Sequence, residues 1–361
     1  MSDLKNRFRG IALATALAVG ALHPAAPARA ETYPNLQEAD LVVKEFHFAD
    51  GETMADVKLH YTTLGTARRN AAGDITNAVM LLHGTTGTGK NFLALSLAGE
   101  LFGPGQPLDA AKYFIILPDG LGRGGSSKPS DGLKGHFPHY GYRDVVESQH
   151  RIATEGLGIK HLKLVLGTSM GGMQCWLWGE TYPDMMDALM PIAAQPVPIA
   201  GRNMLWRRLL IEAIRTDPGW HDGDYATPPT SYTHFVEIGT IMQQSALSLQ
   251  KDAPTRAAAN EFYDKAIAQA ANTDANDLLY WFESSADYDP SADIEKIKAK
   301  VLAVNFGDDL LNPPELGVME TAMKRLKHGR FVLIPGSDKT RGHATLAVAS
   351  VWGRYVKDAL K

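Results

Sequence analysis

One serine in this sequence stands where its neighbours could make it a nucleophile. Ser169 lies in the stretch Gly167-Thr168-Ser169-Met170-Gly171, which follows an apolar run and precedes a segment with helical spacing. Glycine is used where a backbone turns sharply or is approached closely, so this turn would project the serine hydroxyl from the edge of a sheet. A helix N-terminus behind it would favour developing negative charge. The pattern G-x-S-x-G between a strand and a helix is typical of a nucleophile elbow.

A serine hydroxyl is a poor nucleophile alone, so a base and an orienting acid are needed. When the nucleophile sits in such a turn, the acid and then the base follow it along the chain. Asp309 comes just after an apolar run and four residues before Pro313, and we predict it as the acid, with Asp308 as the alternative. His343 comes after the last apolar run, directly after a glycine and directly before a helical segment. We predict it as the base.

Acyl transfer also needs N–H donors for the oxyanion. We predict the backbone N–H groups of Met170, directly after the nucleophile, and of Thr85, in the loop after an earlier strand. The same loop, residues 84–91, matches most of the phosphate-binding pattern G-x-x-x-x-G-K. That pattern next needs Ser or Thr to hold Mg²⁺, and this sequence has Asn91, so we reject a nucleotide site.

Nothing in the sequence indicates a metal or another cofactor. The 12 histidines are scattered and no H-E-x-x-H motif is present. The single cysteine, Cys175, excludes an intrachain disulfide and is expected to face the core from the helix behind Ser169. We give the glycine-rich loop at residues 118–130 a structural role in the pocket wall.

The pattern of apolar and polar residues predicts an α/β fold to hold these side chains. Residues 40–48 and 56–65 alternate apolar and polar side chains, which predicts an antiparallel pair. Later apolar runs are continuous and separated by helix-length segments, which indicates a mostly parallel sheet with helices on both faces. In such sheets ligands gather beyond the carboxyl ends of the strands. The continuous runs are residues 78–84, 113–120, 162–167, 188–195, 300–307 and 330–336.

The strand pattern stops between Pro196 and Pro290, where apolar residues recur at spacings of three and four. We predict that residues 196–290 form a helical cap inserted into a core made of residues 31–195 and 291–361. The cap sets the shape of the pocket and could pair with a second subunit as a homodimer. We expect its large aromatic side chains to form the cap's own core. These are Trp206, Trp220, Tyr280 and Trp281.

Residues 1–30 have the features of a secretory signal peptide. A basic start precedes a short apolar run at residues 11–22 and an A-x-A site at residues 28–30. A run of 12 residues is too short to cross a bilayer as a helix. We therefore expect cleavage before Glu31, no membrane span afterwards, and a periplasmic or secreted location. Loss of this segment, with four basic and one acidic side chain, changes the formal net charge from −4 to −7.

The composition is that of a globular protein. The 361 residues are 45% hydrophobic and 21% charged. A mildly acidic chain without a basic run has no electrostatic footprint for nucleic acid. We therefore expect no nucleic-acid partner, and the chemistry predicted for Ser169 implies a small-molecule acyl substrate.

With these residues placed, the chain resembles the α/β-hydrolase superfamily and, within it, the homoserine O-acetyltransferase-like branch. The resemblance covers most of the chain after residue 30. It implies the α/β-hydrolase fold with an inserted cap, and Ser169, Asp309 and His343 as the triad. The matching segments are FP at 137–138, YRDVVESQ at 142–149, GTSMGGMQ at 167–174, YPD at 182–184, DPGWHDGDY at 217–225 and DDLLNPPE at 308–315.

Three departures from that branch favour a hydrolase over a transferase. The transferases carry an arginine of an R-x-A-I motif that holds the substrate carboxylate, and Ile211 stands in its place here. Arg207 and Arg208 lie one turn earlier and could substitute, but a one-turn shift would misplace a bidentate clamp. HALTG is replaced by HGTTG at residues 83–87. Export would also place the enzyme where acyl-CoA is not expected.

We therefore predict an exported serine hydrolase that cleaves an ester, or alternatively an amide, of a small molecule through an acyl-Ser169 intermediate. The first alternative is an O-acyltransferase that uses the same triad. The second is a catalytically silent binding scaffold on the same fold. The sequence leaves the substrate and the roles of Arg207 and Arg208 open.

Overall fold

The computed structural model describes residues 33–361. The predicted signal peptide lies outside the described residues. Within them, every predicted strand is present. The strands are β1 (Gln37–His47), β2 (Thr53–Leu64), β3 (Ala78–Leu82), β4 (Phe114–Pro118), β5 (Leu164–Thr168), β6 (Ala188–Ile192), β7 (Lys300–Phe306) and β8 (Gly329–Ile334).

The strands form an eight-stranded sheet within residues 33–361, in the order β1-β2-β4-β3-β5-β6-β7-β8. The predicted hairpin is confirmed, because β1 and β2 are antiparallel, with Val43 opposite Val57. β2 also runs antiparallel to β4, and every later pairing is parallel. The side chains of β3, β5 and β6 are buried throughout, which explains why these strands read as continuous apolar runs.

Helices cover both faces of the sheet, each over its own apolar core. Helices α2 and α3 pack on one face with Val165 and Met80, and α1 and the C-terminal helices pack on the other with Leu166 and Val79. The helices are α1 (Leu95–Leu101), α2 (Tyr142–Arg151), α3 (Met170–Thr181), α4 (Gly201–Arg215), α5 (Thr233–Gln243), α6 (Ala246–Asp252), α7 (Arg256–Ala270), α8 (Ala275–Glu283), α9 (Val318–Met323), α10 (Ala349–Trp352) and α11 (Val356–Ala359).

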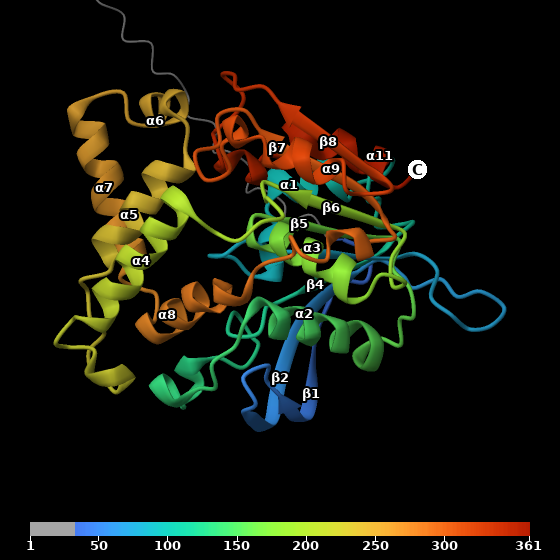
Figure 1. Ribbon diagram of the computed structural model, residues 1–361, viewed down its shortest axis with the longest axis horizontal. Helices are drawn as coiled ribbons and strands as arrows, with labels where there is room; N and C mark the ends of the chain where they lie inside the picture. The colour runs from blue at the N-terminus through green and yellow to red at the C-terminus, as the bar shows by residue number, and fades with distance from the viewer. Residues whose placement is uncertain (1–32) are drawn as a thin grey trace, which may run out of the picture. The chain divides into compact units, whose positions relative to one another are not determined.

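Helices α4 to α8 all lie between β6 and β7 in the chain, where the cap is predicted. Helices α4 to α7 stand together to one side of the sheet (Figure 1). A third apolar cluster joins α4 and α8 through Leu210, Ile214 and Leu279. The expectation for two aromatic residues is wrong, because Tyr280 and Trp281 pack against the core over the sheet rather than inside the cap. Among residues 33–361, no helix combines the length and apolarity required to span a bilayer.

The topology brings the residues with chemistry to one edge of the sheet. Ser169 follows β5, Thr85 lies in the loop after β3, Asp309 lies in the loop after β7, and His343 lies in the loop after β8. Because β3, β5, β6, β7 and β8 are consecutive parallel neighbours, their carboxyl ends meet at the same edge.

Candidate active site

Ser169 occupies a sharp turn between β5 and α3. Its φ and ψ are 54° and −116°, a conformation that a side chain adopts only when the surroundings enforce it. Its own N–H donates to the carbonyl of Ile192 at 2.8 Å, which ties the turn to the end of β6. A Cβ atom on Gly171 would lie 2.1 Å from the carbonyl oxygen of Leu82, so only glycine fits beside β3. The glycines are therefore required by close packing around the serine.

The structure brings the three predicted triad residues together. The Oγ atom of Ser169 lies 2.7 Å from Nε2 of His343, and Nδ1 of His343 lies 2.7 Å from Oδ2 of Asp309. A carboxylate only accepts, so Nδ1 carries the proton and Nε2 is free to accept from the serine hydroxyl. The side chains of His343 and Asp309 are buried, which shields both contacts from water.

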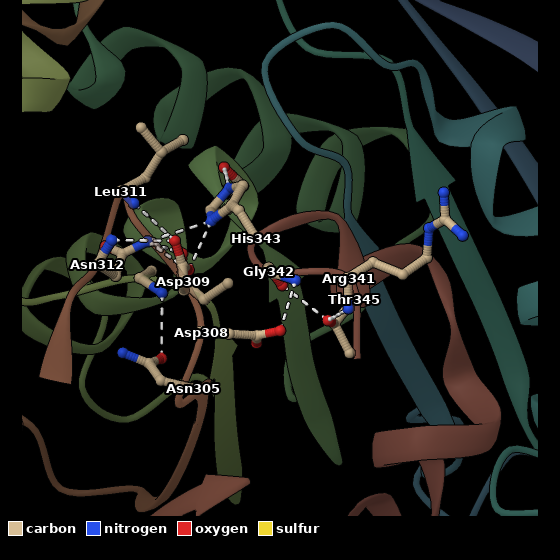
Figure 2. A network of polar contacts seen from close by, with 12 residues as sticks. Asn305, Asp308, Asp309, Leu311, Asn312, Arg341, Gly342, His343 and Thr345 are labelled. Atoms are coloured by element: carbon tan, nitrogen blue, oxygen red, sulfur yellow. Dashed lines mark hydrogen bonds and ion pairs between the residues drawn. The ribbon is translucent and has the colours of Figure 1, made fainter. Parts of the chain in front are cut away.

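The two neighbouring aspartates have different partners. Asp309 faces His343, whereas Asp308 accepts a hydrogen bond from the N–H of Gly342 at 3.1 Å (Figure 2). Asp308 also accepts from Oγ1 of Thr340 at 2.8 Å. Burial by itself would raise the pKa of Asp309. The charge and hydrogen bond of His343, with further donors from Asn312 and Leu311, outweigh burial and hold that pKa below its usual value. Asp309 is thereby kept as an anion beside the imidazole.

The two predicted oxyanion donors are free for a ligand. Met170 is the first residue of α3, so its N–H has no partner within the helix. Within residues 33–361, neither this N–H nor that of Thr85 donates to another protein group. Thr85 lines the same cavity as Ser169. Lys90, of the rejected phosphate loop, pairs with Glu38 at 2.8 Å on the surface.

His83 supports the loop that carries Thr85. Its Nδ1–H donates to the carbonyl of Gly84 at 2.8 Å, and its Nε2 accepts from the N–H of Gly120 at 2.9 Å. The ring stacks on Trp281, with centroids 5.9 Å apart. Burial lowers the pKa of His83 to about 4, so the imidazole is neutral at neutral pH. Trp281 therefore supports the active-site loop instead of the cap's core.

A cavity of about 190 Å³ lies over Ser169 and His343. One wall comes from the loop after β3 and another from cap helix α4. Helical periodicity identifies the apolar face of a helix but not the residues that this face contacts. The sequence therefore did not identify Asn203, Trp206 or Gln243 as cavity residues, and it left the role of Arg207 open. The cap residues that line the cavity are Asn203, Trp206, Arg207 and Gln243.

Arg207 and its neighbours on α4 have separate environments. Arg207 is 3% exposed and lines the cavity, where Nη1 donates to Oγ of Ser285 at 3.0 Å and Nε to Asn203 at 3.1 Å. No acidic side chain within residues 33–361 pairs with it. Arg208 is exposed and pairs with Glu212, and Ile211 belongs to the cap's apolar cluster. Arg207 is thus a buried cation that faces the cavity beside Ser169.

Residues 77–338 match the model of the alpha/beta hydrolase fold family. The chain belongs to this family. It is 35% identical over 221 residues to a homoserine O-acetyltransferase of Moorella thermoacetica, an alignment that covers 55% of this chain and 56% of that enzyme. Enzymes of the homoserine O-acetyltransferase type are therefore among the proteins that this alpha/beta hydrolase chain resembles.

Solved structures with the same fold include both transferases and hydrolases. A homoserine O-acetyltransferase from Bacillus anthracis superposes with a TM-score of 0.78 at 22% identity, over 90% of this chain and 98% of that one. An acetylester hydrolase from Corynebacterium glutamicum gives a TM-score of 0.76 at 21% identity, over 90% and 95%. At these identities the similarity establishes the fold alone. Whether the enzyme hydrolyses its substrate or transfers an acyl group must be argued from the residues of the site.

Proposed function

We propose that this chain is an exported serine hydrolase that cleaves an ester, or alternatively an amide, of a small molecule. The observation that supports it is the chain of contacts from Ser169 through His343 to Asp309 at the wall of a cavity. A serine, a base and a buried acid in this geometry are suited to nucleophilic acyl transfer.

The contacts suggest how the reaction would proceed. His343 removes the proton of Ser169 as Oγ bonds to the acyl carbon, and Asp309 stabilises the resulting imidazolium. The N–H groups of Thr85 and Met170 hold the oxyanion of the tetrahedral intermediate. The C–O bond to the alcohol then breaks and the alcohol leaves with the proton from His343. Water attacks the acyl-Ser169 ester by the same route, which releases the carboxylic acid and regenerates the serine.

A fluorophosphonate probe and a series of p-nitrophenyl esters of graded chain length test this proposal. We expect the probe to label the native protein and the Ser169→Ala variant to remain unlabelled. We also expect that variant to lose about 10⁴-fold or more in kcat, because the triad fails as a unit. Absence of labelling on folded wild-type protein would instead favour a silent binding scaffold.

A second candidate, an O-acyltransferase, is favoured by one specific observation. Arg207 is a buried cation in the cavity without an acidic partner in residues 33–361. Such a group is suited to a substrate carboxylate, as an amino-acid acceptor would supply. The Moorella relative, a homoserine O-acetyltransferase, supports the same candidate.

Product analysis separates the two candidates. The enzyme is given an acetyl ester with water alone, with a simple alcohol, or with homoserine, and the acetylated products are quantified. A hydrolase yields acetate in all three, whereas a transferase forms O-acetylhomoserine at the expense of acetate. If Arg207 holds the acceptor, Arg207→Met removes only the homoserine product.

Export is part of the proposal and rests on residues 1–30, outside the described residues. The segment combines a basic start, a short apolar run and an A-x-A site. N-terminal sequencing of the protein recovered from the periplasm or medium of a Gram-negative bacterial host tests it. Glu31 as the first residue supports export, and a cytoplasmic product that retains Met1 contradicts it.

A further inference from the structure

Asn312 is a buried amide that contacts the triad but is not one of its members. It is 3% exposed and lies in the loop after β7, three residues beyond Asp309. Its Nδ2 group donates to Oδ2 of Asp309 at 3.2 Å (Figure 2). The same group also donates to the carbonyl of Ala193 at 2.9 Å. Both hydrogens of the amide are therefore in use, one on the acid and one on the end of β6.

The orientation of this amide is fixed by its neighbours. The carbonyl of Ala193 and the carboxylate of Asp309 are both acceptors, so the nitrogen of the amide must face them. The same nitrogen lies 3.3 Å from Nδ1 of His343. Because Nδ1–H already donates to Asp309, that third approach is a packing contact, which places the amide against the edge of the imidazole.

The carboxylate of Asp309 is surrounded by donors on both oxygens. Oδ1 accepts from the backbone N–H groups of Leu311 at 2.8 Å and Asn312 at 3.1 Å. Oδ2 accepts from His343 at 2.7 Å and from the Asn312 side chain. Asn312 supplies two of these four donors. Without its side chain, Oδ2 would keep only His343, and the carboxylate could rotate away from the imidazole.

We propose that Asn312 is a positioning residue that anchors the carboxylate of Asp309 to the end of β6 and thereby fixes the orientation of His343 toward Ser169. The inference deepens the proposed function and rests on it, since it assigns the residue that holds the acid of that same triad. A buried amide serves this role because it donates at any pH without adding charge.

Apart from His343, the charged side chains near Asp309 bind other partners and do not position its carboxylate. His343 faces the carboxylate directly, while the Asp308 carboxylate turns to Thr340 and Gly342. From the cap, Arg207 is held by Asn203 and Ser285. Arg341, near His343 in sequence, pairs with Asp252 in α6. The chain behind the amide, at Ala193 and Ala194, contributes no titratable side chain.

The first test is Asn312→Ala, measured with p-nitrophenyl acetate and with the fluorophosphonate probe. We expect kcat to fall by about tenfold or more, the cost of losing one hydrogen bond to a buried anion, with little change in KM. The rate constant for labelling of Ser169 should fall by a similar factor, because it reports the serine's reactivity without substrate binding.

A second variant, Asn312→Asp, keeps the volume of the side chain and replaces its donors by acceptors. Two carboxylates would then lie side by side near His343. The pair would tend to retain a proton, and once both groups ionise their added negative charge would favour the protonated imidazole. We expect the acidic limb of the kcat/KM profile to move to higher pH. In Asn312→Ala, the acidic limb of the kcat/KM profile should stay at the pH of the wild type.

Asn77 offers a matched control, because it is a buried amide whose Nδ2 also donates twice, to the carbonyls of Thr66 and Lys112, far from the triad. Asn77→Ala should lower thermal stability without changing kcat, the labelling rate or the pH profile. Wild-type values of all three in folded Asn312→Asp would overturn the inference. A wild-type protein that the probe does not label would instead overturn the proposed triad.

Discussion

At the scale of single residues, His83 shows how burial keeps an active-site loop independent of pH. Its ring donates to Gly84 and accepts from Gly120, a pattern available only to the neutral tautomer. Protonation would replace the acceptor at Nε2 by a second donor aimed at the N–H of Gly120. The loop that carries Thr85 is thus tied to an imidazole that stays neutral until strongly acidic pH.

This neutrality predicts a pH dependence of stability. With its pKa lowered to about 4 from 6.5, His83 binds a proton more readily in the unfolded chain. The neutral ring's contribution to the free energy of unfolding is fully present above pH 6.5 and is lost as the pH falls toward 4. At pH 5 the free energy of unfolding should already be lower by about 2 kcal/mol. Denaturant unfolding at pH 7 and pH 5 measures it. His83→Gln should lose less stability between these pH values than wild type, and His47→Gln, on the exposed part of β1, should match wild type.

At the scale of elements, the loop that carries His343 is held from two sides. On the core side, Asp308 accepts from Thr340 and Gly342. On the cap side, Arg341 pairs with Asp252 at the end of α6 and donates to Gln244 at 3.0 Å. The side chains of Arg341 and Asp252 are 34% and 30% exposed, so water screens the pair only in part. The position of the cap is therefore coupled to the position of the base.

We expect Asp252→Asn to lower kcat/KM by about twofold to fivefold, the range of a partly exposed ion pair of up to about 1 kcal/mol. The matched control is Glu261→Gln, which removes an ion pair with Lys265 on the exposed face of α7 within the same cap. Steady-state kinetics and thermal unfolding of both variants measure the effect. Equal kinetics in the two variants would show that the loop is positioned from the core alone.

At the scale of the whole molecule, the sheet could be predicted because its central strands β3, β5 and β6 are buried throughout and appear in the sequence as continuous apolar runs. Once those runs were placed, parallel topology required Ser169, Asp309 and His343 to approach one another at a common edge. The choice between Asp308 and Asp309 depended on spacing, and in the structure Asp309 is the one that faces His343. The residues that the sheet brings together at its edge could therefore be predicted mostly from local sequence patterns.

The contributions of the cap could not be predicted in the same way. Helical periodicity identifies a buried face but not its partner, so it could not show that Trp206 lines the cavity, and it left the role of Arg207 open. Trp281 was expected inside the cap and instead stacks on His83, because α8 returns to the sheet. Asn312 lies in a loop whose hydrogen bonds depend on Ala193, more than a hundred residues earlier. These contacts exist only after long-range packing.

Pairing of two subunits through the cap remains a prediction, and the surface of the cap gives it a test. Leu205 and Leu209 on α4 are 68% and 45% exposed, and Ile241 on α5 is 60% exposed. Covering such side chains is favourable, by about 25 cal/mol per Å² of apolar area removed from water. We expect a dimer by size-exclusion chromatography with light scattering, and a monomer after Leu205→Glu. Leu95→Glu, at a leucine of α1 that is 71% exposed outside the cap, should leave the dimer intact. A monomeric wild-type protein at micromolar concentration would show that this apolar surface does not mediate self-association.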